Sequence, residues 1–187
     1  MKRLRRKILL QLTSREEKME FVIAGVLLVV AVGIIGCILG GLKNAEERKY
    51  YDAAARILKE NSLDKIISGH GKKYTERKKM MVYLKILGQS GQGYVFEMEK
   101  GVRIGRSVEE NDLCIRDSHI SGRHCGIYLY GGRPAVKEFQ SSNGTRLKRG
   151  FRKYEVYGTQ WLYSGDVLFV GRSRIKMTFF LFDMTEL

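Results

Sequence analysis

Three short turns in the second half of the sequence carry the side chains best suited to chemistry. They are Gly105-Arg106-Ser107, Ser121-Gly122-Arg123-His124 and Ser142-Asn143-Gly144-Thr145, and each falls between runs rich in Val, Ile, Tyr and Phe. Arginine presents a planar fork that matches phosphate oxygens, serine adds a hydroxyl donor, and asparagine both donates to and accepts from a peptide backbone. Because loops at one end of a β-structure can converge on one ligand, this set suits a phosphorylated side chain on a short peptide.

The same region lacks the residue sets that catalysis needs. The sequence shows no paired catalytic carboxylates, no metal-ligand cluster and no Walker-type loop. We therefore expect no enzyme activity, no catalytic residues, no metal and no cofactor. Taken singly, Arg106 is an ordinary surface arginine, Ser121 a turn former and Asn143-Gly144 a hairpin turn. Only their combination favours binding.

Short strands must position these turns. From Met81 onward the apolar residues recur in short runs, and Gly, Asn, Asp and Ser separate the runs every ~8–12 residues. No helix-length periodic segment interrupts this pattern. Residues 81–187 are therefore predicted to form an all-β sandwich of about ten to eleven short strands. A second Gly171-Arg172-Ser173 segment precedes the last strand and is interpreted as a turn.

At these residues the sequence resembles the forkhead-associated (FHA) domain family. A Gly-Arg pair is followed by Ser-x-x-His and then by Ser-Asn-Gly-Thr, which comes shortly after an acidic-hydrophobic pair, Glu138-Phe139. The resemblance covers residues 81–183, and the joint spacing is more specific than any single turn. The end of the family pattern is also present, in Leu162, Gly165-Asp166, Leu168 and Gly171.

The resemblance implies an FHA-like β-sandwich whose loops bind phosphothreonine. Arg106 and Ser121 would bind the phosphate, and Ser142 would lie beside the phosphate or the threonine methyl group. Asn143 would hold the peptide main chain. Arg123 would be a second cation, a peptide contact or a solvent-facing side chain.

The remaining motif residues are implied to be structural. His124 would brace the loops through hydrogen bonds, while Gly105 and Gly144 would permit tight backbone turns before Thr145. The sequence also departs from the family in two places. Gly122 stands where many members carry Arg or Asn, and Lys148-Arg149-Gly150 replaces the usual Asn-Gly turn, which suggests a longer and more basic loop.

An apolar segment near the N-terminus is the second main feature. Residues 21–42 contain no charged side chain. As a helix they would extend roughly 33 Å, enough to cross a hydrocarbon core of ~30 Å. A long charged stretch precedes them and no Ala-x-Ala-like site follows, so we interpret them as one uncleaved transmembrane helix in contact with membrane lipid.

The flanking segments complete the predicted organisation. Residues 1–20 form a basic tail that is either a short amphipathic surface helix or disordered. Residues 43–80 form a partly helical juxtamembrane linker, with a helix that begins near Asn44. Gly36 and Gly40 form a GxxxG pattern that could support homo-oligomers through the membrane helix.

Charge is spread unevenly along the chain. Of the net charge of +14, residues 1–80 contribute +9 and residues 81–187 contribute +5. We interpret the excess as membrane-flanking charge and expect no nucleic-acid binding. Residues 1–20 hold seven Lys and Arg against five in residues 43–62, which taken alone places the N-terminus inside.

Kinase chemistry argues for the opposite orientation. Phosphothreonine is made by cytoplasmic kinases, so the FHA domain is predicted to face the cytoplasm. The three cysteines favour free thiols in a reducing compartment, although Cys114 and Cys125 could pair if the fold brought them together.

The sequence thus predicts a bacterial, single-pass cell-membrane protein with a cytoplasmic FHA domain. It would recruit a phosphothreonine-containing protein, either a kinase or a kinase substrate. The alternative is a phospho-independent scaffold component of a membrane or secretion apparatus. Thr13 or Thr75, if phosphorylated, could supply a self-ligand.

Overall fold

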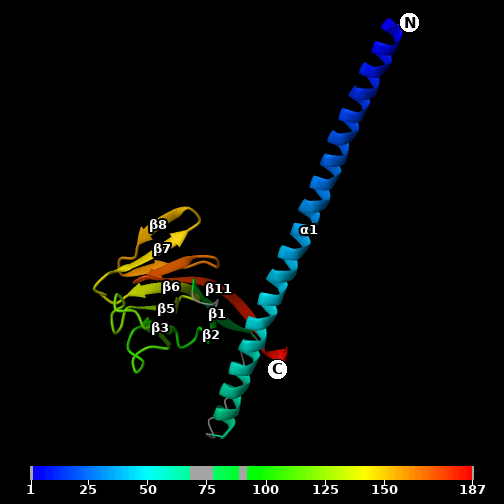
Figure 1. Ribbon diagram of the computed structural model, residues 1–187. Coiled ribbons are helices and arrows are strands. Elements are labelled where there is room, and N and C mark those ends of the chain that lie inside the picture. Colours follow the sequence, from blue (N-terminus) through cyan, green and yellow to red (C-terminus); the bar gives the residue numbers. More distant parts are fainter. Residues whose placement is uncertain (1, 68–77, 89–91, 187) are drawn as a thin grey trace. The chain divides into compact units, whose positions relative to one another are not determined.

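The protein begins with one long helix and continues as a two-sheet β-sandwich (Figure 1). The computed structural model describes residues 2–67, 78–88 and 92–186, with side chains over 25–61, 78–88 and 92–185. Its helices are α1 (Lys2–Ile67) and the short η1 (Met184–Glu186). Its strands are β1 (Lys78–Leu87), β2 (Gly93–Glu97), β3 (Val102–Gly105), β4 (Leu113–Cys114), β5 (Cys125–Tyr130), β6 (Arg133–Glu138), β7 (Thr145–Arg149), β8 (Arg152–Glu155), β9 (Thr159–Trp161), β10 (Val167–Val170) and β11 (Ser173–Asp183).

The strands form two sheets. One has the order β2-β1-β11-β10-β7-β8 and the other has the order β4-β3-β5-β6-β9. Neighbouring strands are antiparallel, except for the short parallel pair β3 and β4. From Val82 to Leu87, strand β1 alternates buried and partly exposed positions, as a strand with one covered face should. The predicted FHA-like sandwich of about ten to eleven strands is confirmed.

One apolar core lies between the sheets. It draws side chains from both, including Leu84 and Ile175 of the first sheet and Ile104 and Ile127 of the second, all fully buried. Burying such a side chain stabilises a fold by about 1.5–3 kcal/mol. The core therefore fixes the ends of the strands that lead into the three candidate turns.

The end of α1 packs on the strands and belongs to the same compact unit, residues 49–187. Ala54 and Leu58 are one helical turn apart and bury against Met81 of β1 and Phe182 of β11. The ring of Tyr51 lies 6.2 Å from that of Phe182. The segment of α1 that contains Ala54 and Leu58 is thus fixed to the sandwich by a small apolar cluster of its own.

Two predicted boundaries were wrong. Asn44 does not begin a helix but lies inside α1, because the apolar segment before it is already helical. Strand β1 begins at Lys78, three residues before the predicted domain start. Lys79 is buried there because its ammonium pairs with Glu97 at 3.4 Å and also with Glu99.

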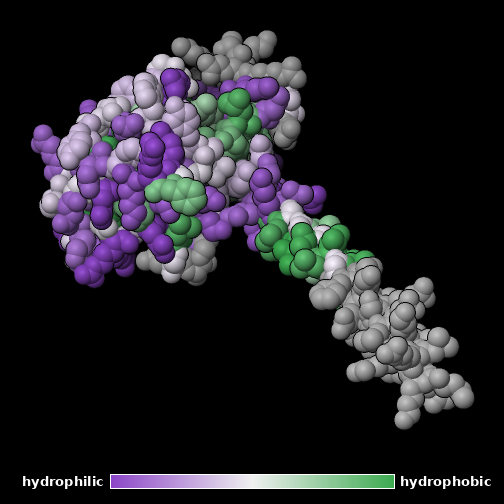
Figure 2. All heavy atoms as spheres, turned by 90° about the horizontal axis from the view of Figure 1, so that it is seen from above, coloured by the Kyte–Doolittle hydropathy of each residue, from purple (hydrophilic) through white to green (hydrophobic). Residues whose placement is uncertain are grey.

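The apolar segment of α1 is exposed in the structure. The large apolar side chains between Val26 and Leu42 are all more than half exposed. Figure 2 shows them gathered along the described part of the helix, whereas the domain surface in view is mainly hydrophilic. By length and composition this helix could cross a membrane. Thr13 lies among residues whose side chains are not described, and Thr75 lies outside the described residues.

Candidate functional site

Three loops meet at one end of the sandwich. They connect β3 to β4, β4 to β5, and β6 to β7. The Arg106 amide donates to the Ser121 carbonyl at 2.9 Å, and the Ser107 amide donates to the Gly122 carbonyl at 3.1 Å. The Ser142 amide donates to Ser121 Oγ at 3.0 Å. The structure therefore brings Arg106, Ser121 and Ser142 together from three separate loops.

The side chains at this junction form a set of hydrogen-bond donors. Ser121 Oγ and Ser142 Oγ lie 3.4 Å apart. The Arg106 side chain is exposed, and within the described part of the chain no ion pair engages its guanidinium. An exposed guanidinium and two hydroxyls, carried by loops that are hydrogen-bonded to one another, are suited to bind a phosphate through charge-assisted hydrogen bonds.

His124 lies behind this junction and is fully buried. Its Nδ1 accepts from the Ser121 amide at 3.2 Å, while Nε2 donates to the Gly144 carbonyl at 3.1 Å. Ser141 Oγ also lies 3.2 Å from Nε2. These partners assign the proton of the neutral ring to Nε2. The imidazole thereby joins the β4–β5 loop to the β6–β7 loop.

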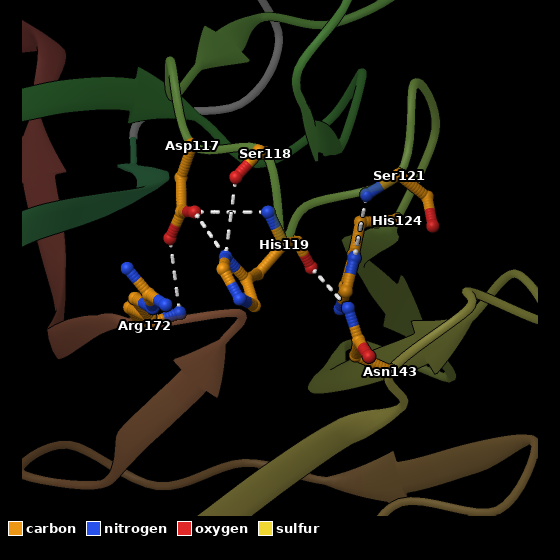
Figure 3. A network of polar contacts seen from close by, with 7 residues as sticks. All are labelled: Asp117, Ser118, His119, Ser121, His124, Asn143 and Arg172. Atoms are coloured by element: carbon orange, nitrogen blue, oxygen red, sulfur yellow. Dashed lines mark hydrogen bonds and ion pairs between the residues drawn. The ribbon is translucent and has the colours of Figure 1, made fainter.

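Asn143 makes a second connection between the same loops. Its Nδ2 donates to the His119 carbonyl at 2.8 Å (Figure 3). Gly144 has a φ of +67°, which a residue with a side chain adopts only at a cost, and it starts the chain into β7 at the buried Thr145. Asn143 is thus an exposed residue on a turn that is fixed by its bond to His119 on one side and by the buried Thr145 on the other.

Asn111 is a buried residue of the site that the sequence did not reveal. Its Nδ2 donates to the carbonyls of Ser107 at 2.7 Å and Gly122 at 2.6 Å. A Cβ on Gly105 would lie 2.2 Å from the Gly122 carbonyl oxygen and 2.7 Å from Asn111 Oδ1. Glycine at 105 is therefore needed because the two loops approach each other so closely.

Comparison with known proteins identifies this region. A family model described as the FHA domain matches residues 102–171, which include all three loops. This segment is an FHA domain. Helix α1 lies outside the matched residues.

Individual proteins are also similar to this chain. An FHA domain-containing protein of Arabidopsis thaliana is 29% identical over 99 residues, which are 52% of this chain and 25% of the relative. The chain thus spans about a quarter of the length of that curated relative. A solved FHA domain described with phosphothreonine-dependent interactions is 26% identical, covers 52% of this chain and 95% of its own, and has a TM-score of 0.46. The FHA domain of an Arabidopsis thaliana hypothetical protein is 24% identical, covers 58% and 94%, and has a TM-score of 0.49.

Arg123 differs from the other candidate ligands of the FHA domain. Its guanidinium carbon lies 5.4 Å from the centre of the Phe139 ring. Phe139 begins the β6–β7 loop, so this stacked contact also joins two of the three loops. The side chain of Arg123 is exposed.

The turn after β7 does not form the longer loop suggested by the sequence. Arg149 pairs with Arg152 across the β7–β8 hairpin, so only Gly150 and Phe151 connect the strands. Arg149 is also not free for a ligand, because its Nη2 donates to Asp166 Oδ2 at 2.7 Å. The suggested longer loop was wrong because a two-residue turn with Gly150 at a φ of +56° suffices.

The cysteines of the FHA domain are free thiols. Cys114 and Cys125 form no disulfide. Cys114 Sγ lies 3.1 Å from the Arg106 carbonyl oxygen, and burial raises the pKa of the Cys125 thiol to about 12. Cys125 is therefore protonated and unreactive at neutral pH.

The buried His124 should make the FHA domain sensitive to mild acid. Burial lowers the pKa of His124 below its ordinary value. The unfolded chain, with a His pKa near ~6.5, then binds more protons than the folded chain as the pH falls below that value. We expect the free energy of unfolding to be greatest above about pH 6.5 and to decrease between about pH 6.5 and 5. Urea unfolding across this range measures it.

Two variants test whether His124 causes the pH dependence of the free energy of unfolding. His119→Gln is the comparison variant, because His119 is partly exposed. His124→Asn should be less stable at neutral pH and should lose most of the dependence. An equal dependence in His124→Asn would show that another group is responsible.

Proposed function

We propose that the FHA domain binds a phosphothreonine peptide, with the phosphate held by Arg106, Ser121 and Ser142. The observation that carries this proposal is their convergence from three loops: the two hydroxyl oxygens lie 3.4 Å apart, and the exposed Arg106 is joined to Ser121 through its backbone amide. A dianionic phosphate accepts several hydrogen bonds, and bonds to charged groups are about twice as strong as neutral ones.

Asn143 and Arg123 flank the proposed phosphate site and would contact the peptide. Asn143 is exposed on a turn fixed by its bond to the His119 carbonyl, so its amide can meet an extended main chain. Arg123 rests on Phe139, which restricts its guanidinium before binding. The partner would be a phosphorylated protein, either a kinase or a kinase substrate.

The proposal is tested with the full chain in detergent micelles against degenerate peptide libraries. The libraries share one fixed central residue, which is phosphothreonine, threonine or phosphoserine. We expect selection from the phosphothreonine library alone. Equal binding of the threonine library would instead favour a phospho-independent scaffold, as would binding that survives Arg106→Ala and Ser121→Ala.

We further propose that α1 anchors this domain to the cell membrane with the domain in the cytoplasm. The exposed apolar side chains from Val26 to Leu42 support the anchor, because lipid would cover them. A Cβ on Gly36 or Gly40 would meet nothing, so a second helix could approach there. A topology reporter fused after Leu187 should be active in the cytoplasm, and external activity would contradict this orientation.

Gly122 offers a site where affinity can be increased. A Cβ there would meet only Glu110 Oε2, at 3.7 Å, so a side chain fits without displacing the loop. We expect Gly122→Asn to tighten phosphothreonine-peptide binding by about two- to fivefold, because one added hydrogen bond contributes ~0.5–1 kcal/mol. Gly122→Ala is the control and should leave the dissociation constant unchanged. An equal gain in both variants would contradict an added peptide contact.

A further inference from the structure

A cavity adjoins the proposed phosphopeptide site. It has a volume of about 490 Å³ and lies between the end of β1, the β4–β5 loop and the β10–β11 turn. Arg116, Arg172 and Arg174 line it, together with Asp117 and Ser118. We call it the arginine cavity. None of these residues is one of the proposed phosphate ligands Arg106, Ser121 and Ser142.

The charge of the arginine cavity is positive. Its three arginine side chains are exposed, and within residues 78–88 and 92–185 no ion pair engages them. Asp117 is the one acidic residue of the lining. The lining thus contains three guanidinium groups and one carboxylate, so the cavity carries a net positive charge.

Asp117 offsets only one of the three positive charges, and its oxygens brace the loops. Oδ1 accepts from the His119 amide at 2.9 Å, and Oδ2 accepts from the Arg172 amide at 3.0 Å. These backbone hydrogen bonds lower the pKa of Asp117, so it stays ionised at neutral pH. The carboxylate fixes the β10–β11 turn to the β4–β5 loop and leaves the guanidinium groups available.

One loop separates the arginine cavity from the proposed phosphate site. In Figure 3, Asp117 and Arg172 lie on one side of His119, and Ser121, His124 and Asn143 lie on the other. Asp117 and Ser121 are four residues apart, so their Cα atoms are at most ~14 Å apart. An extended peptide covers that distance in about four residues.

We propose that the arginine cavity is a second anion-binding subsite, which takes an acidic side chain of the same peptide within about four residues of the phosphothreonine. The acidic group is a carboxylate or a second phosphorylated residue, since a guanidinium fork binds either in a bidentate manner. This inference rests on the proposed function of the neighbouring site. It adds that the partner's phosphothreonine lies in an acidic or multiply phosphorylated segment.

The test uses the full chain in detergent micelles and phosphothreonine peptides that carry Ala, Glu, Lys or phosphoserine at each flanking position in turn. At one or more positions Glu should bind about three- to tenfold tighter than Ala, and phosphoserine at least as tightly as Glu. Added salt should weaken this preference. The comparison of Glu with phosphoserine shows which anion the subsite prefers.

Matched variants locate the effect. Arg172→Gln combined with Arg174→Gln should remove the acidic preference and leave the affinity for the alanine peptide unchanged. Arg152→Gln is the control, because Arg152 is an exposed arginine on β8 and does not line the cavity. Reversal of charge in Arg172→Glu combined with Arg174→Glu should transfer the preference to Lys.

The two proposals fail in different ways. If the alanine phosphothreonine peptide binds but acidic residues give no gain, or if the gain persists in Arg172→Gln with Arg174→Gln, the subsite is wrong and the phosphothreonine site stands. If no phosphothreonine peptide binds, the proposed function is wrong and the subsite falls with it.

Discussion

Replacement of Arg106 with alanine is expected to weaken binding of a phosphothreonine peptide by about a hundredfold, because two charge-assisted bonds are lost. The free energy of unfolding should be unchanged, since the side chain is exposed and engages no ion pair in the described residues. Fluorescence anisotropy with a labelled peptide measures the affinity, and urea unfolding measures the stability.

A conservative variant refines this prediction. Arg106→Lys keeps the charge and loses the planar fork, so its affinity should lie between those of the wild type and Arg106→Ala. Arg152→Ala removes an exposed arginine from β8 and should have no effect. Unchanged affinity in Arg106→Ala would mean that Arg106 does not contact the phosphate.

Replacement of Asp166 with alanine is expected to lower the free energy of unfolding by about 3 kcal/mol. The Asp166 side chain is only 3% exposed. It accepts hydrogen bonds from Arg149 Nη2 at 2.7 Å and Arg149 Nε at 3.0 Å, and from the Tyr163 amide at 2.9 Å. Its loss leaves a partly buried guanidinium without its counter-ion and an amide without its acceptor. Urea unfolding monitored by circular dichroism measures the change.

Asp112→Ala is the matched control for this effect. Asp112 also accepts from an arginine, with Arg103 Nε at 3.1 Å, but both side chains are substantially exposed. Solvent screens such a pair, so a much smaller loss of stability is expected. Similar losses in both variants would contradict the importance of burial at Asp166.

The strands and the three ligand loops could be predicted from the sequence because their signals are local. Period-two runs separated by Gly, Asn and Ser predict strands, and the spacing of Arg106, Ser121 and Asn143 indicates the family. Asn111 could not be found in this way. Its importance depends on the Ser107 and Gly122 carbonyls, which only the folded loops bring to one amide.

The residues at which strands begin depend on partners that are distant in the sequence. Lys79 was expected to lie in the juxtamembrane linker, yet strand β1 includes it because Glu97 and Glu99 neutralise its charge. The predicted turn at Gly171 is confirmed, with a φ of +56°. The bond between this turn and the β4–β5 loop was not predictable, since the Arg172 amide donates to Asp117 across 55 residues of sequence.

The most direct test of the central claim is a calorimetric titration of the full chain with one phosphothreonine peptide and its unphosphorylated twin. The peptide is the sequence selected from the phosphothreonine library. The account predicts that the phosphorylated peptide binds at least about a hundredfold more tightly, because only it offers an anion to Arg106, Ser121 and Ser142. Equal dissociation constants for the two peptides would contradict it.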